Sequence, residues 1–197
     1  MTVETVTLFL ALLAIVAEVI VAGALVLSAG GEISPRAAAV RSAVARSVDD
    51  QALGVAFVVA AVATVGSLYY SEVANFPPCR LCWYQRIAMY PLVPLLGLAA
   101  WRRDAGIRPY AAVLASIGAL ISSYHVLLER YPTLESGVCD PTNPCTLIWV
   151  RRFGYLTIPA MALSAFALIL TLLAVAPGAT TPADDLVSPR ADGDRIT

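Results

Sequence analysis

The sequence predicts an all-α polytopic membrane protein: a bundle of four transmembrane helices with one extra transmembrane helix at its N-terminus. Hydrophobic residues make up 59% of the 197 residues and charged residues only 14%, whereas soluble domains carry about 25% charged residues. Five apolar segments reach the roughly 20 residues that a helix needs to cross a bilayer. Such a chain could not cover its surface with polar groups in water.

Charged or imidazole side chains are rare within the five segments. Glu18 interrupts the first, Arg86 the third and His125 the fourth, while the second and fifth contain none. Helices are expected because a bilayer offers no water to satisfy the backbone. The segments are residues 5–31, 51–71, 81–101, 109–128 and 153–175.

The first segment has a second interpretation, a cleaved signal peptide. Its flank, residues 1–4, is acidic rather than basic, and its apolar stretch is longer than that of a typical signal peptide. These features favour an uncleaved transmembrane helix. We therefore divide the chain into an N-terminal helix with an Arg-rich cytoplasmic linker (1–50), a four-helix catalytic domain (51–176) and a disordered cytoplasmic tail (177–197).

Orientation follows from the arginines, because cytoplasmic loops carry an excess of basic residues. Eight of them fall in the linker, in the turn after the third segment and in the tail; the other five fall on the opposite side. This bias places the N-terminus outside, the C-terminus in the cytoplasm and all four cysteines on the extracytoplasmic face. Disulfides persist on that face. No basic patch indicates nucleic-acid binding. The eight are Arg36, Arg41, Arg46, Arg102, Arg103, Arg108, Arg190 and Arg195.

The cysteines form two pairs in the polar gaps between segments. Cys79 and Cys82 have the spacing of redox-active dithiols, and their motif opens a helix whose dipole favours a thiolate at Cys82. Cys139 and Cys145 enclose a small turn with two prolines, and a bridge there would be exposed and easily reduced. Two static disulfides, or a zinc site using all four cysteines, remain alternatives at this point.

Two polar residues in the segments are candidates for binding a redox carrier. Arg86 lies one helical turn below Cys82 on the same face, where an unpaired charge is costly; snorkelling to the headgroups is the alternative. His125, the only histidine, is expected at a similar depth and in the same pocket, or as a hydrogen-bonded packing residue. Glu18 is expected to be protonated or paired with a neighbouring helix.

The run from Pro78 to Leu92, PCRLCWYQRIAMYPL, closely resembles the signature of the DsbB/BdbC family of disulfide-bond-formation proteins. Tyr124-His125, the pair Cys139 and Cys145, and residues 153–159 (FGYLTIP) extend the resemblance over about residues 53–175. The short spacing of the second pair is more similar to the BdbC branch. Residues 1–50 have no counterpart in the four-helix core of the family.

The resemblance implies a quinone-dependent thiol oxidase of the bacterial cytoplasmic (inner) membrane. Such an enzyme reoxidises a DsbA-like thioredoxin-fold protein and passes two electrons to menaquinone or ubiquinone. By resemblance, Cys82 faces the quinone beside Arg86 and His125, and Cys79 is its partner. Cys139 would be attacked by the partner protein and Cys145 would pair with Cys79. The alternatives are a vitamin K epoxide reductase-like enzyme and a non-enzymatic membrane scaffold with structural disulfides or zinc.

Overall fold

The protein is an all-helical molecule with one two-stranded hairpin, seen in a computed structural model that describes residues 2–175. The expected tail, 177–197, lies outside the described residues. The elements are α1 (Val3–Ile33), α2 (Pro35–Leu68), η1 (Tyr69–Val73), α3 (Arg80–Met89), α4 (Leu92–Arg102), η2 (Ala105–Ile107), α5 (Arg108–Arg130), η3 (Pro132–Leu134), β1 (Arg151–Arg152), β2 (Leu156–Thr157) and α6 (Ile158–Val175).

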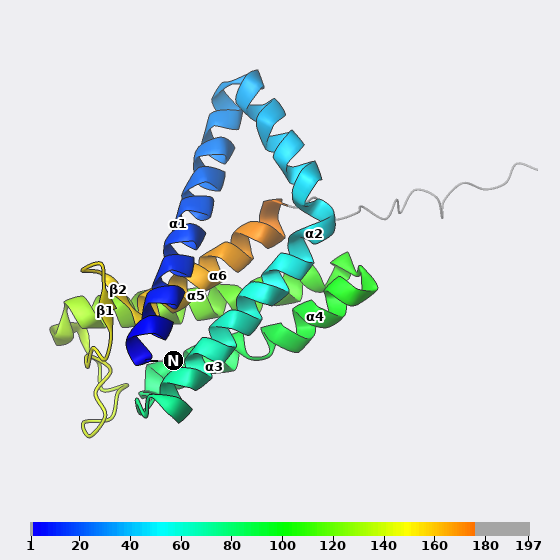
Figure 1. The fold of residues 1–197 in the computed structure, drawn as a ribbon. Helices are drawn as coiled ribbons and strands as arrows, with labels where there is room; N and C mark the ends of the chain where they lie inside the picture. Colours follow the sequence, from blue (N-terminus) through cyan, green and yellow to red (C-terminus); the bar gives the residue numbers. More distant parts are fainter. Residues whose placement is uncertain (1, 176–197) are drawn as a thin grey trace, which may run out of the picture.

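Helices α1 and α2 form a long hairpin whose tip projects beyond the other helices (Figure 1). The other helices pack against the open end of this hairpin: α6 contacts both α1 and α2, and α4 contacts α2. Helix α5 packs along α6. The start of α1 lies at the end of the molecule that carries the cysteine loops, where the Tyr70 hydroxyl donates to Thr7 Oγ1 at 3.2 Å. The Arg108–Asp49 ion pair (3.1 Å) joins α5 to α2 at the start of α5.

Among residues 2–175, four helical stretches are long and apolar enough to cross a membrane. They are Val3–Ile33, Gln51–Val73, Ala105–Arg130 and Ile158–Val175. They agree with the first, second, fourth and fifth segments expected from the sequence. The polytopic, all-α class is thereby confirmed.

The third expected span is not one helix. The chain forms α3, then breaks at Tyr90 and Pro91 and continues as α4. Tyr90 and Pro91 keep right-handed helical backbone angles, but Pro91 has no N–H to donate, so the intrahelical hydrogen bonds are interrupted here. The span from 81 to 101 is therefore two short helices in sequence.

The linker after α1 is helical throughout, because α2 begins at Pro35 and runs for 34 residues. Proline suits this first helical position, where its missing N–H costs little. The division expected at residue 50 thus falls inside a continuous helix. Only the second half of α2 packs in the core, through residues such as Ala56 and Ala60.

The last span begins at Ile158 and not at residue 153. The residues before it form the β1–β2 hairpin, with Arg151 opposite Thr157 and Arg152 opposite Leu156. Phe153 and Gly154 both have positive φ, at 50° and 80°, as hairpin turns that match the strand twist require. Strands of two residues are too short to show an alternating polar and apolar pattern in the sequence.

The core lies where α5 crosses α6 and is packed tightly around Phe166, which is fully buried. A Cβ placed on Gly118 of α5 would come within 2.2 Å of the Phe166 ring. Glycine is therefore required at this crossing, since the backbone of α5 lies against the ring. Phe166 also forms part of the site described next.

Candidate active site

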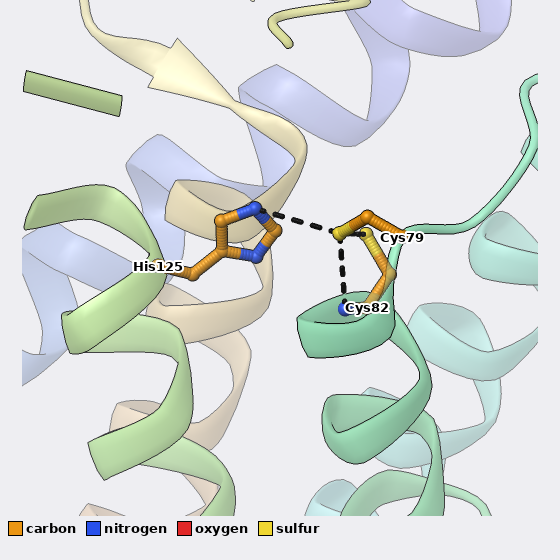
Figure 2. Close-up of side chains that lie close together, drawn as sticks. All are labelled: Cys79, Cys82 and His125. Atoms are coloured by element: carbon orange, nitrogen blue, oxygen red, sulfur yellow. Dashed lines mark hydrogen bonds between the residues drawn. The ribbon is translucent and has the colours of Figure 1, made fainter. Parts of the chain in front are cut away.

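The first cysteine pair opens α3 (Figure 2). Cys79 is the residue that caps the helix, and its Sγ accepts a hydrogen bond from the Cys82 backbone N–H at 3.3 Å. The two sulfurs lie 2.9 Å apart and are not bridged. The extended Pro77-Pro78 segment delivers Cys79 to this position.

Negative charge is favoured on Cys79 rather than on Cys82, chiefly by the hydrogen bond between the two sulfurs. The hydrogen bond from the Cys82 thiol, together with His125 and the Cys82 backbone N–H, lowers the pKa of Cys79 and outweighs the opposing effect of burial. From the sequence we expected the thiolate at Cys82. The difference arises because Cys79 occupies the capping position, where a side chain can reach the free N–H groups.

His125 of α5 connects the two cysteine pairs. Its Nδ1 accepts from Gln85 Nε2 at 3.0 Å, and its Nε2 lies 3.0 Å from the Cys145 carbonyl oxygen. The same Nε2 lies 3.8 Å from Cys79 Sγ (Figure 2). These partners select the tautomer with its proton on Nε2, since a carbonyl oxygen can only accept. The ring is buried, so these contacts fix its orientation.

The second cysteine pair, Cys139 and Cys145, is bridged. Both cysteines are buried, so the exposed bridge expected from the sequence is not observed. The loop of this pair is folded around Asp140, whose Oδ1 accepts from the Thr142 backbone N–H at 2.8 Å and from the Thr142 hydroxyl at 2.7 Å. Asn143 Nδ2 donates to the Pro78 carbonyl oxygen at 3.2 Å. The loop is thereby held beside the residue that precedes Cys79.

Arg86 lies one turn further along α3 and is half-buried. Its Nε donates to Ser67 Oγ and its Nη2 to the Ser67 carbonyl oxygen, both at 3.0 Å. The guanidinium carbon also lies 5.2 Å from the centroid of the Trp83 ring. Ser67 of α2 and Trp83 therefore hold the charge in place within the bundle, as a cation over an aromatic face.

An apolar cavity of about 300 Å³ lies between α1, α2, α3 and α6. Cys82, Gln85 and Arg86 supply polar atoms to its wall, and most of the remaining lining is aliphatic. Phe76 and Trp149, stacked with ring centroids 5.0 Å apart, also line it. Ligand sites in proteins have this character, mostly apolar with a few placed polar groups.

His125 does not line this cavity, so the expectation that it shares a pocket with Arg86 is wrong. It lines a separate small cavity of about 20 Å³ with Cys79, Cys82 and Glu129. Gln85 lies between Arg86 and His125, since it lines the large cavity beside Arg86 and its Nε2 donates to His125 Nδ1. Cys82 alone of the four cysteines lines both cavities.

The reduced dithiol and His125 also form a set that could hold a metal ion. Their ligand atoms, two sulfurs and one imidazole nitrogen, all lie within 4.8 Å of one another. A zinc site built from all four cysteines is not formed, because Cys139 and Cys145 are bridged to each other. Structural zinc sites usually have four protein ligands, one more than this set supplies.

Glu18 is paired, as the sequence led us to expect for an acid inside an apolar helix. Its Oε2 accepts from the Tyr155 hydroxyl at 2.6 Å and its Oε1 from the Ser164 hydroxyl at 2.9 Å. Ser164 belongs to α6 and Tyr155 to the hairpin loop. The carboxyl group of α1 thus reaches two other parts of the bundle.

Three residues of the site were not singled out from the sequence: Ser67, Gln85 and Asn143. Gln85 is next to Arg86 in the signature run, and its amide in an apolar segment was a usable signal. Ser67 and Asn143 carry no such signal, because serine in a membrane helix and asparagine in a loop are both ordinary. Only the fold brings them to Arg86 and to Pro78.

Comparison with known proteins identifies the family. The profile described as "Disulfide bond formation protein DsbB" matches residues 49–176, well over half of the chain. The chain belongs to the DsbB family. The DsbB match begins inside α2 and extends through the end of α6, so it includes both cysteine pairs, Arg86 and His125 but leaves α1 outside.

Several curated relatives agree with the DsbB assignment. "Disulfide bond formation protein C" of Bacillus subtilis is 45% identical over 124 residues, which cover 62% of this chain and 89% of the relative. "Probable disulfide formation protein" of Oceanobacillus iheyensis is 44% identical over 59% of this chain and 81% of its own length. A protein of the same description from Coxiella burnetii is 41% identical over 62% of this chain and 84% of its own. No solved structure matches the chain significantly.

Proposed function

We propose that this protein is a membrane protein-disulfide oxidase that reoxidises a DsbA-like thioredoxin-fold protein and passes the electrons to membrane quinone. The observation that carries the proposal is the position of the first cysteine pair. Cys82 lines the large apolar cavity, while Cys79 lies against His125, which in turn contacts the loop of the second pair. The names of the relatives, disulfide formation proteins, support the same activity.

Thiol–disulfide exchange accounts for the electrons on the protein side. A thiolate of the reduced partner attacks the Cys139–Cys145 bridge and forms a mixed disulfide, and the second partner thiol resolves it. The partner leaves oxidised, and the loop now holds the two electrons as two thiols. A loop thiolate, which we assign to Cys145, attacks Cys79 of an oxidised Cys79–Cys82 pair and expels Cys82. The other loop thiol then restores the loop bridge and releases Cys79.

The residues around the first pair assist this exchange. His125, with its proton on Nε2, points at both Cys79 Sγ and the Cys145 backbone, so it can stabilise a thiolate that forms there. The hydrogen bond from Asn143 to Pro78 holds the loop close to its target. Attack requires this proximity, because exchange proceeds through a direct sulfur–sulfur contact.

The large cavity fits a lipid-soluble quinone, either menaquinone or ubiquinone. Its aliphatic walls suit an apolar ring and tail, Cys82 offers the redox-active sulfur, and Arg86 offers a cation for a carbonyl oxygen. When bound, the quinone supplies an acceptor for two electrons. Arg86 holds its charge ready through Ser67, so little reorganisation is needed when negative charge develops nearby.

The orientation in the membrane is part of the proposal. The cysteine loops and the start of α1 lie at one end of the bundle, and the tip of the α1–α2 hairpin lies far from them (Figure 1). We assign the cysteine end to the extracytoplasmic face of a bacterial cytoplasmic membrane. The arginine distribution and the need for persistent disulfides both support this assignment.

An anaerobic assay tests the function. Purified protein is mixed with oxidised menadione or decylubiquinone and a reduced thioredoxin-fold dithiol protein, and quinol formation is followed by absorbance beside a Cys82→Ser variant. We expect quinol formation that depends on both the dithiol protein and Cys82. Absence of quinol with either acceptor, from protein with intact cysteines, would refute the oxidase.

Metal analysis tests the alternative that the cysteines bind zinc. The observation in its favour is the close grouping of Cys79, Cys82 and His125. Stoichiometric zinc that survives purification and prevents quinol formation would support a metal site. We expect protein free of stoichiometric metal that turns over.

A further inference from the structure

We propose that α1, which lies outside the family match, forms a wall of the quinone cavity and helps to determine which quinones reach Cys82. This inference rests on the proposed function. Five residues of α1 line the cavity: Val16, at the edge of the lining face, and four others that share this face, spaced by three, four and seven positions from the first of them. These four are Leu10, Leu13, Ala14 and Ala17.

The lining face of α1 lies close to α2 because small residues line their contact. A Cβ placed on Gly66 of α2 would lie 2.9 Å from Leu10 Cδ1, so the leucine packs directly on the backbone. Ala14 and Ala17 are buried and leave room beside them. The cavity therefore has a closed side here, where the four-helix core by itself would present α2 and α6 to lipid.

Polar contacts fix α1 in this position. The Tyr70 hydroxyl donates to Thr7 near the cysteine end, and the hydroxyls of Ser164 and Tyr155 donate to Glu18 further along the helix. Isolated polar groups in a membrane are costly, so separating α1 from the bundle would leave the Glu18 carboxyl without these partners. Specific hydrogen bonds therefore hold α1 in the bundle.

The residues that line the cavity indicate which part of a quinone would contact α1. Cys82 and Arg86 come from α3, whereas the residues from α1 are all aliphatic. A quinone whose ring lies beside Cys82 would place carbon, not oxygen, against α1. Changes in the size of α1 side chains should therefore alter quinone binding without affecting exchange between cysteine pairs.

The test uses adjacent leucines of the full-length protein. Leu13 is 39% exposed and lines the cavity, whereas Leu12 is 49% exposed and does not line it, so Leu13→Phe and Leu12→Phe make the same chemical change at two similarly exposed positions. The phenylalanine side chain of Leu13→Phe would occupy part of the cavity, and a tenfold loss of affinity corresponds to about 1.4 kcal/mol. We expect Leu13→Phe to raise the KM for menadione and decylubiquinone about tenfold, and Leu12→Phe to leave it unchanged.

Two further readouts separate binding from turnover. The increase of Tm on adding decylubiquinone reports binding directly, because a ligand of the native state stabilises it; we expect a smaller increase for Leu13→Phe. The rate at which the reduced partner opens the loop bridge should be the same in all variants. If Leu13→Phe does not fold, Leu13→Ala with Leu12→Ala replaces it, with weaker quinone binding expected for Leu13→Ala alone.

The possible failures are distinguishable. If the unmodified protein neither reduces nor is stabilised by either quinone, the proposed function is refuted. If the unmodified protein does both, and the Leu13 variants bind and reduce quinone as the Leu12 variants do, the role of α1 is refuted while the function stands.

Discussion

The two cavities beside α3 differ in almost every respect although Cys82 lines both. The small one is enclosed by Cys79, His125 and Glu129 and lies next to the loop disulfide. The large one is aliphatic, contains Arg86, and extends along α1 and α2. The contrast shows that a small polar cavity and a large apolar one can meet at the same cysteine, since Cys82, together with Trp149 and Ile158, lines both.

Removing the charge of the large cavity should have the largest selective effect. We expect Arg86→Leu to raise the KM for decylubiquinone by about ten- to a hundredfold, because hydrogen bonds to charged groups contribute about 1.5–3 kcal/mol. Opening of the loop bridge by the partner should be unchanged. Arg80→Leu, in the exposed first position of the same helix, is the matched control, and equal effects of the two substitutions would contradict the assignment of Arg86.

Changing the small cavity should give the opposite pattern. His125→Asn removes the group that contacts Cys79 and Cys145 together, and we expect electron transfer between the pairs to slow about tenfold, in line with a loss of roughly 1.4 kcal/mol. Stopped-flow measurement of the exchange, with the quinone KM measured in parallel, checks this. A raised quinone KM with unchanged exchange would place His125 with the large cavity after all.

Gly118 tests whether the packing behind the large cavity matters. Gly118→Ala forces a Cβ into the Phe166 ring, and overpacking of this kind costs about 1–3 kcal/mol. We expect a lower Tm, and weaker quinone binding because Phe166 lines the cavity. Gly23→Ala is the control, since a Cβ there meets nothing within 4 Å; a Tm lowered equally by both would show that the crossing is not tight.

The last prediction concerns a pH dependence confined to the dithiol. In the reduced native state the pKa of Cys79 is lowered by the Cys82 thiol, by His125 and by the helix N-terminus. Between this lowered pKa and the unfolded thiol value of about 8.5, the unfolded chain holds a proton that the native state has lost. Stability of the reduced protein should therefore rise with pH in this interval, by at most about 1.4 kcal/mol per unit. This contribution of Cys79 to stability is fully present above its unfolded pKa and is lost as the pH falls through its folded pKa. Thermal unfolding of reduced protein beside Cys79→Ser checks this, and parallel pH profiles would contradict it.

Sequence reasoning found the parts of the fold that depend on apolar length. Four of the five expected spans appear as helices, because lengths near 20 residues and a lack of charge suffice to predict them. The division of the third span at Tyr90 and Pro91 was foreseeable from the proline, but hydropathy averages over such a break. The hairpin before Ile158 was not foreseeable, since its strands are only two residues each.

The candidate site could likewise be predicted from the sequence only in part. The four cysteines and Arg86 are recognisable because their residue types and spacing are unusual in apolar sequence. The separation of His125 from Arg86 could not be predicted, because it depends on how α3 is rotated against α5 and not on depth along the helices. The participation of α1 in the cavity depends on contacts between residues more than a hundred positions apart, such as Glu18 with Ser164, which differ by 146.

That separation has a consequence for how the protein is made. Helix α1 is synthesised before the other described helices, and the two partners of Glu18, Tyr155 and Ser164, follow it by 137 and 146 residues. Until they are synthesised, the Glu18 carboxyl group lacks both of these hydrogen-bond donors. The large cavity is therefore completed only when α6 packs against α1 and α2, so a chain that stopped before α6 would contain all four cysteines but not the full lining of this cavity.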